Sequence, residues 1–299
     1  MKAFVLILFS ALLISFISEK KFAPGKVAAP PGTVQLKDSL YIDKFEITNE
    51  MWRAYTEGWL LKTEDDTTTY AKMQPDSTVW YSLKMDNEKY VTEYFKSPEF
   101  SDYPVVGITY EQAVAYCEWR TERVNEFLEK TRDANFRNVV YRLPTETEWE
   151  LAAAGKLDLV KFPYGYEQTI LHKKDDTTKM FNCYYDNIDS AQQNAQNIAM
   201  PVSFGKPNQY GIYNIIGNVG EMVSEKGLAK GGFYDLPLEY CKVKEKFSYN
   251  EPNRYLGFRC VCLVDNAFST KKQKELIKQQ KPDKKSKNKK DVKGAEQNQ

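Results

Sequence analysis

The side chains best able to do chemistry in this sequence are its five cysteines, which are Cys117, Cys183, Cys241, Cys260 and Cys262. A thiolate can attack as a nucleophile, ligate a soft metal or enter a disulfide. Five cysteines cannot all pair within one chain, so at least one thiol remains for another role. His172 is the only histidine, so a histidine-rich metal site and a Cys-His or Ser-His-Asp nucleophile have little to build on. We expect a surface or structural role for His172.

Several short motifs follow one another in an order that resembles a known domain. They are Tyr-Pro-Val-Val-Gly-Ile-Thr at 103–109, Ala-Tyr-Cys-Glu-Trp at 115–119, Arg-Leu-Pro-Thr-Glu-Thr-Glu-Trp-Glu at 142–150, Gly-Asn-Val-Gly-Glu at 217–221, Lys-Gly-Gly-Phe-Tyr at 230–234 and Leu-Gly-Phe-Arg-Cys at 256–260. Together they resemble the formylglycine-generating enzyme, or sulfatase-modifying factor, domain over about residues 31–263. The resemblance implies an α+β fold of the C-type-lectin-like type with little regular secondary structure. Residues 117–126 most resemble the gliding-motility and type IX secretion envelope proteins, which use this domain for assembly.

In this family, two cysteines after the Gly-Gly pair bind copper, and the copper centre uses oxygen to oxidise a sulfatase cysteine to formylglycine. Cys241 matches the second position, nine residues after the second glycine, whereas Leu236 stands at the first and Phe233 replaces the expected serine. Copper(I) favours two thiolates and leucine has no electron pair to donate, so we expect no copper and no oxidase activity. Cys241 is then a buried thiol or a disulfide partner of Cys183 or Cys262. A copper oxidase with Cys241 as its catalytic residue is the alternative.

The resemblance also implies a calcium loop and a structural disulfide. Asn218, Gly220 and Glu221 match the family's Gly-Asn-x-x-Glu loop. Its carbonyls, one amide and one carboxylate supply much of the roughly six to eight oxygens that calcium takes. A metal-free Asn/Gly turn is the alternative. Cys117 and Cys260 match a bridge found in the family.

Charge and hydropathy divide the 299 residues into four segments. Residues 1–18 join Lys2 to an apolar run and are typical of a secretory signal, with an uncleaved anchor as the alternative. Residues 19–32 are a Pro- and Ala-rich linker, and residues 33–265 form the domain. Residues 266–299 are predicted to be disordered.

The composition of the C-terminal segment indicates which kinds of partner to expect. Residues 271–299 carry 11 lysines and four acidic residues, a balance of +7 in a chain whose total is +1. They contain no aromatic residue, which argues against stacking on nucleic acid bases and favours a solvated tail. We expect an exported protein that is periplasmic, in the cell envelope or secreted. Its partners would be envelope proteins, with membrane contact only through an uncleaved signal.

The sequence predicts two clear helices in the domain, each marked by a capping box. Thr109 and Gln112 form a predicted capping box for a helix that continues to about residue 130. Thr145 and Glu148 form a second, for a short helix that ends at Gly155. Along this short helix three alternating glutamates should splay apart and face solvent, and these are Glu146, Glu148 and Glu150.

The N-terminal part of the domain has weaker signals. Residues 36–47 alternate loosely and predict one or two strands. Thr48 and Asn49 are a plausible start for a helix with Trp52 and Tyr55 on one face. Residues 65–101 are polar and aromatic without a clean period, which predicts an insertion or a long surface excursion.

These observations favour a non-catalytic envelope interaction or assembly module, related to gliding or type IX secretion proteins. The copper-dependent oxidase is one alternative. The other is a small-ligand binder, because the fold resembles C-type lectin domains in which loops bind the ligand.

Overall fold

The computed structural model describes residues 29–62, 66–83, 87–131, 138–173, 176–185 and 198–265. The predicted signal, most of the linker and the lysine-rich tail lie outside these residues. No helix in the described ranges is long and apolar enough to cross a membrane.

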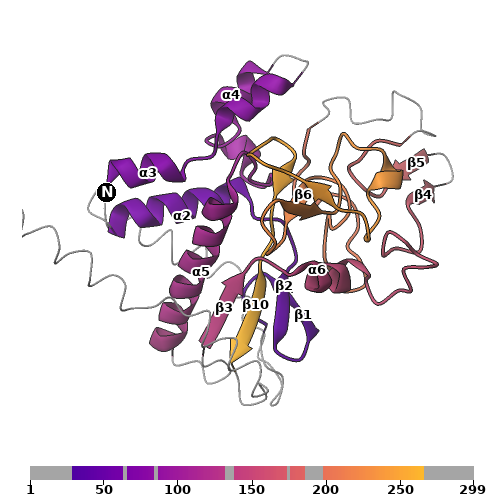
Figure 1. Cartoon of the computed structure of the whole chain (residues 1–299), viewed down its shortest axis with the longest axis horizontal. Coiled ribbons are helices and arrows are strands. Elements are labelled where there is room, and N and C mark those ends of the chain that lie inside the picture. The colour runs from indigo at the N-terminus through magenta and orange to yellow at the C-terminus, as the bar shows by residue number, and fades with distance from the viewer. Residues whose placement is uncertain are drawn as a thin grey trace, which may run out of the picture.

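A four-stranded antiparallel sheet brings the two ends of the domain together. Its order is β1-β2-β10-β3, with β1 at Thr33–Lys37, β2 at Leu40–Asp43, β10 at Val261–Asp265 and β3 at Asn138–Arg142. The last strand of the domain thus lies between the second and third (Figure 1). The predicted strand signal at 36–47 corresponds to β2 and the end of β1.

A second sheet is built from very short strands. Its order is β8-β7-β6-β9, with β8 at Phe247–Ser248, β7 at Leu228–Lys230, β6 at Gly220–Met222 and β9 at Leu256–Gly257. Strands β6 and β9 pair in parallel and the others are antiparallel. A separate hairpin consists of β4, Ile170–Lys173, and β5, Asp176–Lys179. Long irregular connections join these strands, as the α+β prediction expected.

The helices lie in the first part of the domain, and α5 packs against the first sheet. They are α2 at Asn49–Lys62, α3 at Thr67–Met73, α4 at Glu88–Glu93, α5 at Tyr110–Thr131 and α6 at Glu146–Ala153, with 3₁₀ turns η1 at Ser77–Ser82, η2 at Pro98–Phe100 and η4 at Leu238–Tyr240. Helix α5 runs along β3, and α2 packs against α5 (Figure 1). Both predicted capping boxes are confirmed by reciprocal hydrogen bonds, between Thr109 and Gln112 and between Thr145 and Glu148.

Two large apolar clusters form the core, one on each face of the first sheet. The predicted faces of α2 and α5 enter the first cluster through Trp52, Tyr55, Tyr116 and Cys117. The second contains Trp149 and Cys241. Gly155 has a φ of +58°, in the left-handed region, and this supports its predicted role after α6.

Residues 66–83 and 87–101 differ from the predicted surface excursion. They form α3, η1, α4 and η2, and bury a third apolar cluster that includes Trp80, Tyr90, Tyr94 and Phe100. The Trp80 and Tyr94 ring centroids are 4.5 Å apart. The elements here are only three to seven residues long, so no helical or strand period extends far enough to be recognised.

Candidate functional site: the Cys241 segment and its surroundings

Cys241 lies at the end of η4 and is completely buried. Its Sγ is 3.6 Å from the carbonyl oxygen of Pro237 and 4.0 Å from that of Leu236, so this turn of chain folds around the thiol. Gly232 packs on the other side with a φ of +74°, and a Cβ there would overlap Cys241 Sγ. Gly232 therefore allows the backbone to approach the thiol closely.

Leu236 and Phe233 are both in apolar contacts. Leu236 is half-buried against the cluster that contains Cys241, and its carbonyl oxygen accepts a hydrogen bond from the Tyr184 amide at 3.0 Å. The Phe233 ring centroid lies 4.5 Å from that of Tyr255. Leucine cannot donate an electron pair to a metal, so a two-thiolate copper site at positions 236 and 241 does not fit the residues present.

The five cysteines fall into two groups. Cys183 is in the same apolar cluster as Cys241, whereas Cys117, Cys260 and Cys262 belong to the cluster around α5. Burial raises the pKa of the Cys262 thiol to about 12, and this thiol lies beside the Tyr141 hydroxyl. Of the two candidate partners for Cys241, the fold thus favours Cys183. Burial raises the pKa of Tyr164, and Cys241 and Cys183 raise it further, so both thiols lie near this ring.

Cys117 Sγ and Cys260 Sγ are 3.5 Å apart, and both residues are buried. Burial, and then the neighbouring Cys117, raise the pKa of Cys260 well above its usual range. The fold thus brings together the pair for which a disulfide is predicted. The bond itself stays a prediction.

The predicted calcium residues are already engaged with protein groups. Both carboxylate oxygens of Glu221 accept hydrogen bonds from Arg259, at 2.6 and 2.7 Å, and one also accepts from Trp149 Nε1 at 2.7 Å. The Asn218 Oδ1 accepts from Asn182 Nδ2 and from the Met200 amide, at 3.0 and 2.8 Å. Calcium would have to displace a buried guanidinium to reach Glu221.

The rest of this loop offers calcium little more. Gly220 begins strand β6, and its amide donates to the Tyr255 carbonyl. In the described part of the chain, no group of three or more His, Cys, Asp or Glu side chains is arranged to hold a metal. The side chains of this loop, as they lie here, do not fit calcium, and its binding remains an untested prediction.

Glu46 completes a buried charge cluster with Glu221 and Arg259. All three side chains are almost fully buried, and Glu46 Oε2 is 3.9 Å from Arg259 Nη2. Glu46 Oε1 accepts a hydrogen bond from Asn218 Nδ2 at 2.8 Å. Burial raises the pKa of Glu46 to about 8, against an opposing effect of Arg259 and with a further rise from Glu221. Arg259 pairs with Glu221 and lies farther from Glu46, and burial favours the protonated form of Glu46 at neutral pH.

The three glutamates of α6 do not all face solvent as predicted. Glu146 and Glu150 converge on the Nζ of Lys230, at 3.2 and 3.0 Å, and the Lys230 side chain is fully buried. Glu148 points elsewhere and forms a two-bond pair with Arg142, at 2.6 and 2.7 Å. Glu146 and Glu150 are four residues apart and so lie on one helix face, and this spacing could have predicted that they converge. Nothing in the sequence indicated that Lys230, 80 or more positions away, would be their partner.

His172 lies in β4, and its side chain is outside the described part. Its predicted structural role therefore remains a prediction.

Comparison with known proteins places this fold in one family. A family model described as "Sulfatase-modifying factor enzyme 1-like domain" matches residues 14–264. The chain belongs to this family, and the predicted formylglycine-generating-enzyme type of α+β fold is confirmed.

The individual relatives are distant. The formylglycine-generating enzyme of Thermomonospora curvata is 27% identical over 218 residues, covering 68% of this chain and 64% of that protein. The inactive C-alpha-formylglycine-generating enzyme 2 of Bos taurus is 25% identical over 208 residues, covering 62% and 59%. This chain thus spans less than two thirds of these relatives' length. Among solved structures, Treponema denticola variable protein 1 has 18% identity and a TM-score of 0.46, with 82% of this chain and 98% of that chain covered.

Proposed function

We propose that this chain is a non-catalytic member of the family that serves as an exported interaction module in the cell envelope. The observation that carries the proposal is Leu236, which stands where the family's first copper-binding cysteine belongs. A thioether, thiolate or imidazole at this position could bind copper(I), but an alkyl side chain cannot.

The surroundings of Cys241 support the same conclusion. A reacting thiol needs access to its substrate and a lowered pKa or a metal to hold it as a thiolate. Cys241 is fully buried, and its Sγ contacts two carbonyl oxygens, which do not stabilise a thiolate. Inactive relatives also occur in the family, since one similar bovine protein is named as inactive.

Exposed aromatic side chains next to the Cys241 segment support the interaction role. Tyr184 and Tyr240 are 44% and 51% exposed. Tyr184 pairs through its backbone with Leu236 and Leu238, while Tyr240 ends the same turn. Half-exposed tyrosines are common anchors in protein interfaces. The resemblance of residues 117–126 to gliding-motility and type IX secretion proteins makes envelope assembly the setting we propose.

The loss of catalysis can be tested with a sulfatase-motif peptide. Copper-loaded protein is incubated with the peptide in air, and the mass of the peptide is followed. We expect the cysteine to remain unchanged for the wild-type chain and for Cys241→Ala alike. An aldehyde product that is formed by the wild type and lost in Cys241→Ala would overturn the proposal. Leu236→Cys tests whether adding the missing thiolate beside Cys241 is enough to restore copper binding.

The interaction role is tested by crosslinking in the cells that produce the protein. We expect the wild-type chain to form discrete crosslinked species that weaken when Tyr184 and Tyr240 are both changed to serine. Tyr81→Ser is the matched control, since Tyr81 is 65% exposed in η1. Equal loss in the control, or no crosslinked species at all, would contradict the proposed surface.

A further inference from the structure

A pocket of about 140 Å³ lies between α2, α5 and the strands β2 and β3, and no residue of the Cys241 segment lines it. Its walls are apolar and aromatic, and they come from Phe45, Ile47, Met51, Ala54, Tyr116, Trp119, Val124 and Tyr141. Met51 and Trp119 are only half-buried, so part of this apolar surface faces water. An apolar cavity of about this volume in another protein holds a single benzene ring. The pocket thus has room for one aromatic side chain.

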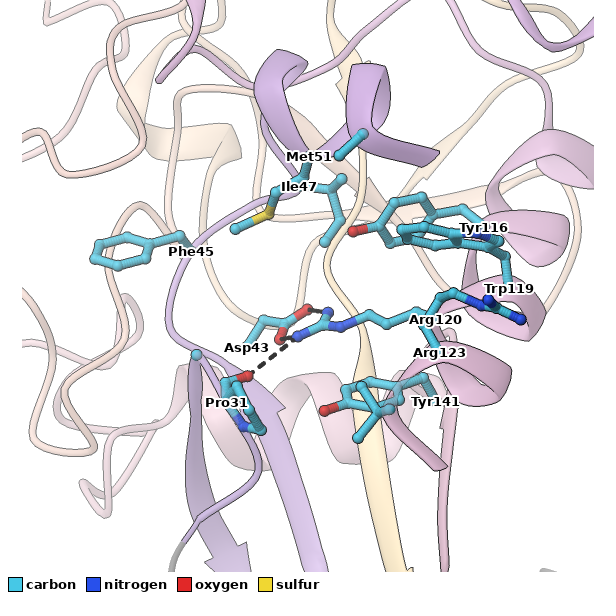
Figure 2. A pocket seen from close by; sticks show the side chains of 13 residues that line it. Pro31, Asp43, Phe45, Ile47, Met51, Tyr116, Trp119, Arg120, Arg123 and Tyr141 are labelled. Atoms are coloured by element: carbon cyan, nitrogen blue, oxygen red, sulfur yellow. Dashed lines mark hydrogen bonds and ion pairs between the residues drawn. The ribbon is translucent and has the colours of Figure 1, made fainter. Parts of the chain in front are cut away.

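Asp43 and Arg120, which line the pocket, are paired with each other. Arg120 donates two hydrogen bonds to the Asp43 carboxylate, at 2.7 and 2.8 Å (Figure 2). The Arg120 guanidinium also lies 4.1 Å from the Tyr141 ring centroid. Breaking a partly buried, bidentate pair is costly, so neither charge is available to a charged occupant. We therefore expect an apolar occupant.

The chain enters the domain at the edge of this pocket. Pro31 lines the pocket and stands two positions after the first residue that the structure describes. Arg120 Nη2 donates to the Pro31 carbonyl at 3.3 Å, and Thr33 Oγ1 donates to the Pro30 carbonyl at 2.7 Å, so hydrogen bonds fix the entry there. Figure 2 shows Pro31 across the pocket from Trp119 of α5. The segment that precedes the described chain therefore begins within a few residues of the pocket wall.

Residues 19–28 are this preceding segment, and they contain one aromatic side chain, Phe22. Phe22 stands nine positions before Pro31, a length of chain that can span about 30 Å when extended, so its ring can reach back to the pocket. Between them, Pro24 and Gly25 form a dipeptide that favours a turn and so a reversal of the chain. A phenylalanine ring also has the size and the apolar character that the pocket accepts. Length, turn signal and size thus all favour Phe22 as the occupant.

The charge of residues 19–28 suits the rim of the pocket. Arg123 lines the pocket beside Glu122 and Glu126, with which it forms ion pairs. Two glutamates around one arginine leave this part of the rim with a net negative charge. Residues 19–28 carry three lysines and one glutamate, a net positive charge. Opposite charges of this kind orient a segment on a surface, although exposed pairs add little to its affinity.

We propose that residues 19–28 fold back over this pocket and that the Phe22 ring fills it. The segment is tethered to the pocket wall at Pro31, so its effective concentration at the pocket is in the millimolar range, as for short flexible linkers. Burial of one phenylalanine ring then suffices to hold it, because only the ordering of a short segment opposes the gain in buried apolar area. This contact does not depend on the non-catalytic role proposed above.

Photocrosslinking on the purified exported chain locates Phe22. The protein is produced with 4-azidophenylalanine in place of Phe22, and mass spectrometry first confirms that the exported protein retains this position. On illumination we expect an intramolecular crosslink to the α2 or α5 peptides that carry Met51 or Trp119. The same photoreactive residue in place of Tyr81, which is exposed in η1, should not reach these peptides. A crosslinked dimer would assign the pocket to a second copy of the chain, and it would overturn the proposal, as would the absence of any crosslink to α2 or α5.

Thermal unfolding of variants assigns the contact to this pocket. Phe22→Ser should lower the thermal midpoint by about 2 to 4 °C, the size of shift that losing one modest apolar contact gives in a domain of this length. Val27→Ser changes another apolar side chain of the same segment and should have a smaller effect. Ala54→Leu fills the pocket from α2, so Phe22→Ser should have no effect in that background. It should keep its effect beside Ala71→Leu, which makes the same change at an exposed position of α3. An unchanged midpoint for Phe22→Ser, an equal loss in the Ala54→Leu background, or a larger loss for Val27→Ser would overturn the proposal.

Discussion

Arg259 supplies the positive charge that pairs with Glu221. Its guanidinium bonds to both oxygens of Glu221 and to the backbone carbonyls of Asp43, Lys44 and Tyr213. These groups come from distant parts of the chain, and the loop motif alone cannot distinguish a metal from an internal arginine as their partner. Sequence reasoning singled out Glu221 and missed the arginine that pairs with it.

The buried Glu46 predicts a specific pH dependence of stability. The pKa of this carboxyl is about 8 in the folded chain and near 4.5 in the unfolded chain, so between these values the folded state binds more protons. The free energy of unfolding should be highest below pH 4.5 with respect to this group. It should fall by up to about 1.4 kcal/mol per pH unit as the pH rises from about 4.5 to about 8, and level off above pH 8.

Glu46→Gln provides the comparison for this prediction. Glutamine keeps an oxygen that can accept from Asn218 Nδ2 but cannot lose a proton. Urea unfolding at several pH values from 5 to 9 should therefore give a flatter stability profile for the variant, with its relative advantage greatest at high pH. Parallel profiles for the two proteins would show that Glu46 ionises normally in the folded state.

At the scale of helices and strands, the sequence predicted those features that depend on residues close together in the chain. The capping boxes at Thr109 and Thr145 fixed the starts of α5 and α6 within one residue, because each box is closed by residues three positions apart. The burial of Trp80 and Lys230 could not be predicted in the same way. Trp80 is buried by other short elements of residues 66–101, and Lys230 by two glutamates from a distant helix.

Thr145→Ala tests how much the α6 capping box contributes. The Thr145 hydroxyl accepts from the Glu148 amide at 3.2 Å, and Glu148 accepts from the Thr145 amide at 2.9 Å. Losing the hydroxyl should lower the free energy of unfolding by about 1 kcal/mol, measured by urea denaturation. Thr145→Ser keeps the acceptor and should cost much less. Equal losses in both variants would assign the effect to the methyl group instead.

At the scale of the whole molecule, β10 ties the domain together. It lies between β2 and β3 and carries Cys262, while Cys260 immediately precedes it. Helix α5 approaches the same place through Cys117, which lies 143 positions earlier than Cys260. A covalent bond here would fasten the long central helix to the C-terminal strand, so it would constrain most of the folded chain at once.

We therefore expect a disulfide between Cys117 and Cys260 in protein exported to an oxidising compartment. Their sulfurs are 3.5 Å apart, and the bond would close a loop of 143 residue steps. The chain-entropy model gives about 5 kcal/mol for a loop of this length, and many bridges deliver less. Adding a reductant should lower the thermal midpoint of the wild-type chain by more than that of a Cys117→Ser, Cys260→Ser double variant. A Cys183→Ser, Cys241→Ser double variant is the matched control and should keep the part of the response that comes from Cys117 and Cys260. Peptide mapping under non-reducing conditions should recover the two cysteines as one crosslinked peptide, and two free thiols in the exported protein would rule the bond out.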